Sequence, residues 1–261
     1  MRRMTEGADE VKPAVSYKPY VYRGEGTGWF QVLLWSSFRV LLQFLAIIFF
    51  GVRIHGRENI PRRGPALLLT NHQSFLDPWL IGIALYRQIH FVARESLFRG
   101  GFVQYVLERT NAFPIKRGRA DAGAMRESIR CLEKGYLLNL FPEATRTKDG
   151  SIGAVGSAVS IIIRRAKVPV IPIVVDGPFE AWSRNRLLPR CIRIRVIYGK
   201  PIPPEQLGDL SPDEMAIAVR KEMIRLQCEL KSPHAAKSQA RLEADLAKGR
   251  ARLVVSQEFT E

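Results

Sequence analysis

Short apolar runs alternate with helix-forming segments over most of this chain, and that alternation limits the folds open to it. Apolar runs of about four to eight residues between turn residues are typical of buried strands. Such runs lie at 66–70, 89–93, 137–141, 168–175 and 191–198, and segments with helical periodicity lie at 78–86, 97–109, 122–134, 154–166 and 211–230. The pattern predicts an α/β fold with a mostly parallel or mixed sheet flanked by helices.

The charge of the chain restricts its partners. A formal net charge of +15 requires an anionic environment: nucleic acid, phospholipid headgroups or a phosphorylated substrate. Aromatic residues do not interleave with the basic ones as they do in nucleic-acid-binding motifs, so we expect no nucleic-acid partner. Cys131, Cys191 and Cys228 form an unpatterned, odd-numbered set, which predicts reduced thiols in a cytosol-facing protein and no metal site.

Residues 29–52 are almost entirely apolar and predict attachment to a membrane, behind a flexible polar arm at 1–28. A helix of this length can cross a hydrocarbon layer of about 30 Å. However, Arg39 would cost roughly 2.5–3.5 kcal/mol at the bilayer centre. A helix lying in the interface, with Arg39 and Gln43 on its wet side, avoids that cost. We therefore expect a membrane-anchoring helix, and favour an interfacial position over a full span.

The seven residues Asn71-His72-Gln73-Ser74-Phe75-Leu76-Asp77 join a predicted strand to a predicted helix. A histidine at such a turn, with a carboxylate five residues on, can be held in one orientation. Its other ring nitrogen is then free to take a proton from an alcohol. Alternatively, His72 caps the helix and Asp77 is a solvated acid favoured by the helix dipole. The spacing alone leaves both interpretations open.

Three further segments bring charged residues or prolines to the ends of predicted elements. Residues 113–119 hold three cations, 141–147 follow a strand, and 168–173 carry two prolines, which suggest an edge or interrupted strand. Each has a simpler interpretation: a solvated basic loop, a local Glu143–Arg146 salt bridge, or protection of a sheet edge. Ligands of open α/β sheets bind at the carboxyl ends of strands, so the segments together favour a functional site.

The order of these motifs resembles the 1-acylglycerol-3-phosphate acyltransferase family of the glycerolipid acyltransferase superfamily. The motifs are Asn-His-x4-Asp at 71–77, Phe-Pro-x-x-Arg at 113–117, Phe-Pro-Glu-x-Thr-Arg at 141–146 and Val-Pro-Val-Ile-Pro at 168–172, within a likeness that runs from 55 to 203. The resemblance implies transfer of a fatty acyl group from acyl-CoA or acyl carrier protein to a lysophospholipid hydroxyl. The implied acceptor is 1-acylglycerol-3-phosphate, which would give phosphatidic acid.

The resemblance further implies a place in phospholipid biosynthesis. It implies no cofactor beyond the acyl-CoA or acyl carrier protein co-substrate, and membrane lipids as partners. The expected location is the cytoplasmic face of a membrane, such as the inner membrane of a bacterium. The donor, the chain length and the oligomeric state stay open.

The family's functional residues map onto this sequence by motif. The resemblance implies that His72 is the general base and Asp77 its orienting carboxylate. It also implies direct attack on the acyl thioester, so Ser74 is not expected to be a nucleophile. Arg117 would receive the phosphate of the acceptor. The third motif would supply the remaining substrate-binding residues, which are Glu143, Ala144, Thr145 and Arg146.

Two positions depart from the family pattern, which usually has glycine in place of Asn111 and Ala144. If the backbone at 144 takes a positive φ, the extra methyl group is unfavourable, whereas asparagine tolerates that conformation better. The acceptor therefore stays open, and the alternative is another lyso-lipid: an amino-acid lipid or a headgroup-bearing lysophospholipid. The non-enzyme alternative is a basic membrane-surface protein. Such a protein would have no use for the four motif residues together, which are His72, Asp77, Glu143 and Arg146.

These motifs divide the chain into an acyltransferase domain at 53–230 and a charged C-terminal tail at 231–261, either a surface helix or frayed. Ser211-Pro212-Asp213-Glu214 has the form of a capping box that begins a helix reaching about residue 230. Residues 184–200 contain five arginines and no acid, with Leu187 and Leu188 among them, which suits a headgroup boundary. Two of these arginines, 193 and 195, can equally form the wet face of a strand.

Overall fold

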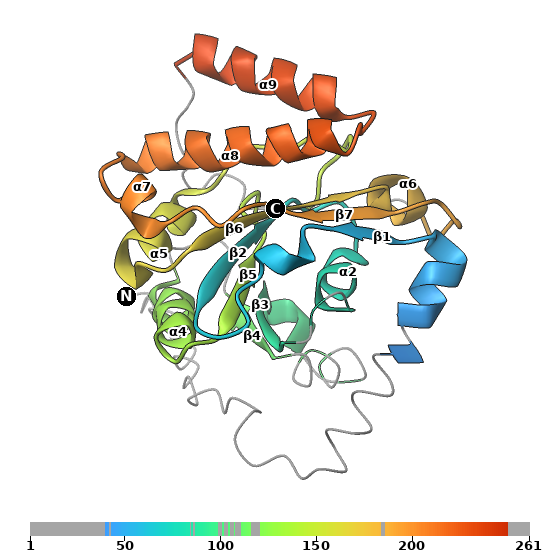
Figure 1. Ribbon diagram of the computed structural model, residues 1–261, viewed down its shortest axis with the longest axis horizontal. Helices are drawn as coiled ribbons and strands as arrows, with labels where there is room; N and C mark the ends of the chain where they lie inside the picture. The colour runs from blue at the N-terminus through green and yellow to red at the C-terminus, as the bar shows by residue number, and fades with distance from the viewer. Residues whose placement is uncertain are drawn as a thin grey trace, which may run out of the picture.

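The structure is a computed structural model that describes residues 40–249 except 42, 84, 86, 99–100, 102–103, 105–106, 108–110, 116–120 and 184–185. The described residues form a seven-stranded sheet in the order β1-β7-β6-β2-β5-β3-β4 (Figure 1). The strands are β1 (Arg53–His55), β2 (Ala66–Thr70), β3 (Ile89–Arg94), β4 (Ala112–Ile115), β5 (Leu137–Leu140), β6 (Val170–Asp176) and β7 (Arg195–Tyr198).

The sheet is mixed. The strands β2 to β6 run parallel to one another, while β7 is antiparallel to β6 and parallel to β1. β2 lies between β5 and β6, so the chain leaves the centre of the sheet in both directions. In such a topology the carboxyl ends of the central strands form the usual ligand site. The predicted α/β fold with a mixed, helix-flanked sheet is confirmed.

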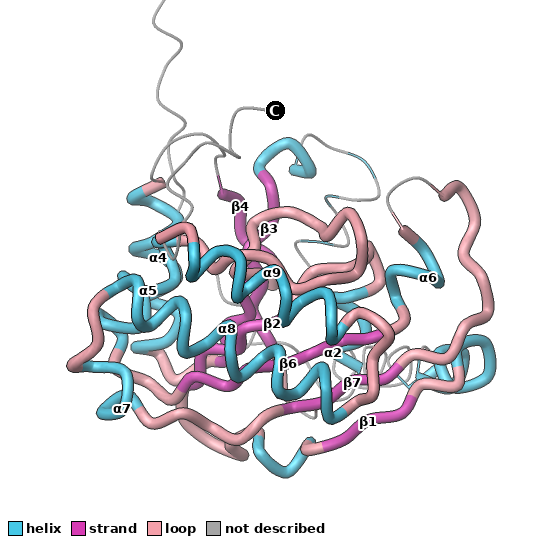
Figure 2. Tube along the Cα trace, turned by 90° about the horizontal axis from the view of Figure 1, so that it is seen from above, coloured by secondary structure: helices cyan, strands magenta, loops and turns pink. Residues whose placement is uncertain are grey.

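Helices cover both faces of the sheet (Figures 1 and 2). One hydrophobic cluster joins Leu67 and Leu69 of β2 to several helices, and the other joins Ala66 and Leu68 to α2. Alternate residues of β2 thus point to opposite layers, and a strand buried on both faces has a continuous apolar sequence. The first face carries α4 (Ala122–Glu133), α5 (Ser157–Ala166) and α8 (Pro212–Glu229), and the second carries α2 (Asp77–Ile83).

The remaining described elements are short, apart from α9 (Ala235–Ala247), which packs on α8. Of the two alternatives for the chain beyond residue 231, a helix is therefore observed over most of the described part. The capping box is also observed, because Ser211 and Glu214 exchange side-chain to backbone bonds. The short elements are α6 (Pro178–Trp182), α7 (Pro204–Gly208) and the 3₁₀ turns η1 (Arg57–Asn59) and η2 (Glu95–Phe98).

The proline-containing strand differs in part from expectation. β6 lies between β2 and β7, so the prediction of an edge strand is wrong. Pro172 is tolerated because the β6–β7 ladder is interrupted there, between the Val170–Ile202 bridge and the Ile173–Tyr198 pair. Its carbonyl still accepts a hydrogen bond from the Gly199 backbone N–H at 2.8 Å. The alternative of an interrupted strand is confirmed.

The predicted membrane-anchoring segment is described only from residue 40. Residues 40–41 and 43–50 are helical, and no helix among the described residues is both long and apolar enough to cross a bilayer. Residues 29–39 and 42 lie outside the described part. The expectation that Gln43 faces the headgroups is wrong, because its amide donates to the carbonyl oxygen of Ile83 at the end of α2. A terminal helical carbonyl lacks an intrahelical partner, and Gln43 supplies one.

Candidate active site

The turn after β2 places His72 and Asp77 in direct contact. The Nδ1 atom of His72 lies 2.7 Å from Oδ2 of Asp77. An ionised carboxylate only accepts hydrogen bonds, so Nδ1 carries the proton and Nε2 presents its lone pair. The Asp77 side chain is fully buried, whereas 20% of the His72 side chain remains exposed. The geometry suits a base that is oriented from inside the protein and reached from outside.

Asp77 is held by the backbone of the same turn. Its Oδ2 atom also accepts the N–H groups of Gln73 at 2.6 Å and Ser74 at 2.8 Å. Asp77, the first residue of α2, therefore holds the turn that precedes the helix and orients His72 at the same time. The prediction of a solvated acid is wrong, because the carboxylate is enclosed within the turn.

Asn71 fixes the turn to the sheet. Its side-chain amide donates to the carbonyl of Val175 at 2.9 Å and accepts the N–H of Val175 at 2.8 Å. These two bonds continue the β2–β6 pairing beyond the last residue of β2. The opposite side of the turn is fixed by stacking of the His72 ring on Phe141, with ring centroids 4.1 Å apart. The turn that carries the histidine is thus fixed to the strands on either side of β2, which are β6 and β5.

Glu143 supports His72 from the loop after β5. Its Oε1 atom accepts the His72 backbone N–H at 3.2 Å, and its Oε2 accepts the Gly153 N–H at 2.9 Å. Burial raises the pKa of Glu143 to about 7, with a smaller rise from the charge of Asp77, against the opposing effect of the two N–H donors. Both carboxylate oxygens are bound within the protein, so in this structure Glu143 supports the turn.

The rest of the third motif lines the same turn. The guanidinium of Arg146 lies 3.6 Å from the ring centroid of Phe75, whose side chain is exposed. Thr145 is partly buried beside it. Ala144 has φ of +58° and Asn111 has φ of +56°, so both positions that depart from the family's glycines take left-handed backbone. The expected unfavourable methyl at 144 is therefore present.

Two other residues considered in the sequence, Ser74 and Arg117, do not add to the described geometry of the site. The Ser74 hydroxyl donates to the carbonyl of Trp182 at 2.7 Å and accepts the N–H of Leu76, which leaves it as a structural link. Arg117 lies outside the described residues, so its expected contact with the acceptor phosphate stays a prediction. β4, which precedes it, ends at Ile115 on the far edge of the sheet.

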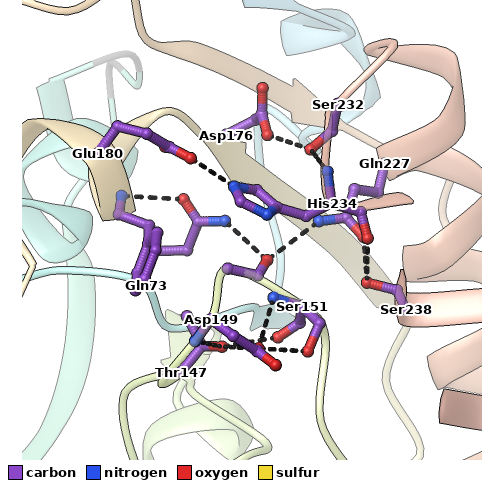
Figure 3. Close-up of polar contacts among 12 residues, drawn as sticks. Gln73, Thr147, Asp149, Ser151, Asp176, Glu180, Gln227, Ser232, His234 and Ser238 are labelled. Atoms are coloured by element: carbon purple, nitrogen blue, oxygen red, sulfur yellow. Dashed lines mark hydrogen bonds and ion pairs between the residues drawn. The ribbon is translucent and has the colours of Figure 1, made fainter. Parts of the chain in front are cut away.

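Sequence reasoning missed a polar network behind the site (Figure 3). The carbonyl oxygen of Gly150 accepts the side-chain amides of Gln73 at 3.2 Å and Gln227 at 3.3 Å. The side-chain oxygen of Gln73 also accepts a hydrogen bond from the Phe179 N–H. The side-chain oxygen of Gln227 accepts one from the hydroxyl of Ser238. The residue after the candidate base is thereby linked to α8 and α9. Glutamines far apart in sequence carry no periodic signal that could have revealed this link.

A second histidine completes that network. His234 lies with Nε2 2.5 Å from Oε1 of Glu180, and its ring makes an edge contact with Phe179 (Figure 3). A Cβ atom at position 150 would come within 2.5 Å of the His234 ring, and φ there is +79°, so only glycine fits. The ring, the Gly150 backbone and Gln73 thus pack as one unit.

Comparison with known proteins identifies a shared domain. The acyltransferase family model matches residues 51–176. A relative from Bacillus subtilis, a 1-acyl-sn-glycerol-3-phosphate acyltransferase, is 25% identical over 174 residues, 66% of this chain and 84% of the relative. The chloroplastic enzyme LPAT1 of Arabidopsis thaliana is 28% identical over 177 residues, 66% of this chain and 48% of that protein. The aligned part thus spans about half of the chloroplast relative.

The fold also has a solved counterpart. The crystal structure of the 1-acyl-sn-glycerophosphate acyltransferase PlsC from Thermotoga maritima superposes with a TM-score of 0.63 at 24% identity, covering 78% of this chain and 88% of that one. The likeness shows a common fold. Together with the family match, it confirms the resemblance inferred from the four motifs.

Proposed function

We propose that this chain, an acyltransferase by its domain at residues 51–176, transfers a fatty acyl group to the hydroxyl of 1-acylglycerol-3-phosphate. The acyl donor is acyl-CoA or acyl carrier protein, and the product is phosphatidic acid. The observation that carries the proposal is the His72–Asp77 pair, a partly exposed imidazole on a fully buried carboxylate. The names of the curated relatives support this choice of acceptor.

The mechanism follows from the orientation of the ring. Nε2 of His72 removes the proton of the acceptor hydroxyl as its oxygen attacks the thioester carbonyl. The tetrahedral intermediate collapses, the C–S bond breaks, and the thiolate takes the proton back from the imidazolium. The negative charge of Asp77, 2.7 Å from Nδ1, stabilises the imidazolium between these steps. No acyl-enzyme forms, which agrees with the structural use of the Ser74 hydroxyl.

Acceptor binding involves the two arginines of the second and third motifs. Arg146 is partly buried against the exposed ring of Phe75, where it can meet an anionic headgroup while the ring contacts the glycerol or acyl portion. Arg117 contributes a forked guanidinium, which binds phosphate in two-point contacts. Both arginines therefore favour a phosphate-bearing acceptor over a neutral one.

We also propose attachment to the cytoplasmic face of a membrane through residues 29–52. The described part of this segment exposes an apolar surface while Ala46 and Phe50 pack on the core. Such one-sided packing leaves the apolar surface available to a bilayer interface. The exposed apolar residues of this helix are Val40, Leu41, Phe44, Leu45, Ile47, Ile48 and Phe49.

Acylation of a panel of labelled lyso-lipids by the purified full chain, with each donor in turn, tests the proposed function. The His72→Ala variant should lose about 10²–10⁴-fold in turnover while it keeps its fold. His55→Ala is the matched control, because His55 is exposed on β1. Near-normal turnover by His72→Ala would refute the mechanism. Transfer only to another lyso-lipid would correct the acceptor, and no transfer at all would favour the membrane-surface protein.

A further inference from the structure

Two adjacent leucines protrude from the loop after α6. The side chains of Leu187 and Leu188 are 95% and 79% exposed, and the next most exposed large apolar residue of the described part is Phe44 at 60%. Apolar residues that occur singly on a surface are ordinary, but two neighbours with nearly full exposure place a compact apolar area in water. We call residues 186–190 the arginine–leucine loop.

The charge around the leucines is of one sign. Arg186 and Arg190 flank them, and the sequence from 181 to 204 contains neither Asp nor Glu. One terminal nitrogen of Arg186, Nη1, is shielded from solvent without a hydrogen-bond partner among the described residues. A buried guanidinium nitrogen without an acceptor favours an incoming oxyanion. Apolar residues between arginines match the layered chemistry of an anionic bilayer, with phosphates outside and acyl chains beneath.

The loop is physically connected to the turn that carries His72. The indole N–H of Trp182 donates to the carbonyl of Arg186 at 3.0 Å, and the carbonyl of Trp182 accepts the Ser74 hydroxyl at 2.7 Å. The Trp182 ring also lies against Phe75, with ring centroids 6.3 Å apart. A single tryptophan therefore joins the arginine–leucine loop to the second and third residues after the histidine.

The loop lies at the same end of the molecule as the N-terminal helix. The N–H of Ile194, four residues after the loop, donates to the carbonyl of Phe50 at 2.9 Å. In both views the chain after α6 reaches the end of the molecule where residues 43–50 lie (Figures 1 and 2). α5 lies at the opposite end. Two segments with exposed apolar residues, distant in the sequence, thus lie at one end of the molecule.

We propose that the arginine–leucine loop inserts Leu187 and Leu188 into an anionic lipid bilayer, with Arg186 and Arg190 at the level of the phosphates. Through Trp182, this contact holds the turn that carries His72 at the membrane surface, where a lyso-lipid acceptor is located. Only this second part rests on the proposed function, because the loop's chemistry favours an anionic membrane whatever the enzyme acts on.

A fluorophore at the loop tests insertion directly. The label is attached in the full chain to Leu188→Cys, in a background where the exposed Cys191 and Cys228 are replaced by serine. With vesicles of about 30% phosphatidylglycerol in phosphatidylcholine, its emission should shift to the blue and be quenched by acyl-chain quenchers. The control is Ile161→Cys in the same background, because Ile161 is exposed on α5. Equal emission at the two positions, with the protein bound to vesicles, would overturn the proposal.

A second experiment separates the loop from the chemistry. The variant Leu187→Gln with Leu188→Gln should turn over a vesicle-embedded acceptor at least about tenfold more slowly, yet a short-chain acceptor below its micelle concentration within about twofold of normal. Ile161→Gln should change neither rate. Equal losses on both acceptors would make the loop a structural support and refute its membrane role. If the unaltered chain acylates neither acceptor, the proposed function fails, while the fluorophore still decides insertion.

Discussion

Two histidines in this molecule pair with carboxylates, and the pairs differ in what surrounds them. His72 lies 2.7 Å from Asp77 and His234 lies 2.5 Å from Glu180, and their side chains are similarly exposed, 20% and 15%. The two carboxylic acids differ in their exposure to solvent. Asp77 is fully buried, whereas the Glu180 side chain is 34% exposed. A short distance between histidine and carboxylate therefore does not by itself mark a catalytic pair.

The difference lies in which groups are fixed and which are left free. Two backbone N–H groups hold the Asp77 carboxylate, and Nε2 of His72 has no hydrogen-bond partner among the described residues. In the second pair, Nε2 of His234 contacts the carboxylate of Glu180, and the His234 ring packs against Gly150. In the first pair, hydrogen bonds fix the carboxylate and Nδ1 of the histidine, while Nε2 stays available, as a proton acceptor requires. The second pair connects α6 to the turn before α9.

The largest contrast should appear when each acid loses its charge. In Asp77→Asn the amide oxygen can replace Oδ2 and keep all its bonds, because Oδ1 has no partner in the described part of the chain. The fold then persists while the imidazolium loses its counter-charge, and turnover should fall at least about 10²-fold. Glu180→Gln should change turnover less than about threefold. Initial rates with saturating substrates measure both, and similar effects of the two substitutions would remove the distinction drawn between the pairs.

A smaller effect should show that the polar network behind the site supports the first pair. Gln227→Leu removes one donor to the Gly150 carbonyl and the acceptor for Ser238, which should lower the free energy of unfolding by about 1–3 kcal/mol. Because Gly150 also holds Gln73, kcat should fall several-fold with little change in KM. Leu242→Ala is the control, since Leu242 is buried on α9 without polar links. If an equally destabilised Leu242→Ala loses as much kcat, the network acts on stability alone.

The sequence predicted one pair and missed the other for a physical reason. The bounds of β2 and the turn that carries His72 follow from local patterns: an apolar run, a turn and an acid at a fixed spacing. The partners of His234 come from 150, 179 and 180, which only the tertiary fold brings together. Local composition likewise could not decide whether Pro172 marks an edge or an interruption, because both remove a ladder bond.

The same limit applies to side-chain direction. The amphipathic pattern placed Gln43 on the wet side of its helix, yet its amide binds the end of α2. The pattern of a helix shows which residues share a face but not what that face meets. In contrast, the glycine-to-alanine departure at 144 led to a correct conditional expectation, because a positive φ is a property of the backbone at one residue.

Glu143 offers a pH test of the support behind His72. Its pKa is raised to about 7 in the folded chain, so between pH about 4.5 and 7 the folded protein binds more protons there than the unfolded chain. Stability from this group therefore decreases as pH rises through that window. Glu143→Gln removes the dependence, so relative to the unaltered chain it should gain about 2 kcal/mol in unfolding free energy between pH 5 and pH 8. Urea unfolding at both pH values measures the gain.

The activity of the same variant should move the other way. Glutamine can accept only one of the two backbone N–H groups that Glu143 holds, so the tie to His72 or to Gly153 is lost and turnover should fall. Glu222→Gln serves as the control, because Glu222 pairs with Arg225 on the outer part of α8. A pH dependence of stability that is unchanged by Glu143→Gln would show that the carboxyl is ionised throughout the window.

The smallest expected effect concerns the turn that carries Glu143. At φ of +58°, the Cβ of Ala144 crowds the backbone, a cost of roughly 1–2 kcal/mol that glycine avoids. Glycine in turn has more freedom in the unfolded chain, which returns about 0.4–1 kcal/mol of that gain. Ala144→Gly should therefore stabilise the fold by about 0.5–1 kcal/mol, measured by thermal or urea unfolding. Asn111→Gly should gain less, because asparagine tolerates this conformation at φ of +56°.

A control away from the site separates stability from function. Lys167 has φ of +49° at the end of α5, so Lys167→Gly should stabilise the fold comparably without changing turnover. If Ala144→Gly also leaves the rate unchanged, the methyl is only a local strain. A higher rate on 1-acylglycerol-3-phosphate with Ala144→Gly alone would show that the methyl restricts the acceptor. The setting of His72 would then differ from that of His234 in substrate contact as well as in hydrogen bonding. A destabilised Ala144→Gly would refute the strain at this turn.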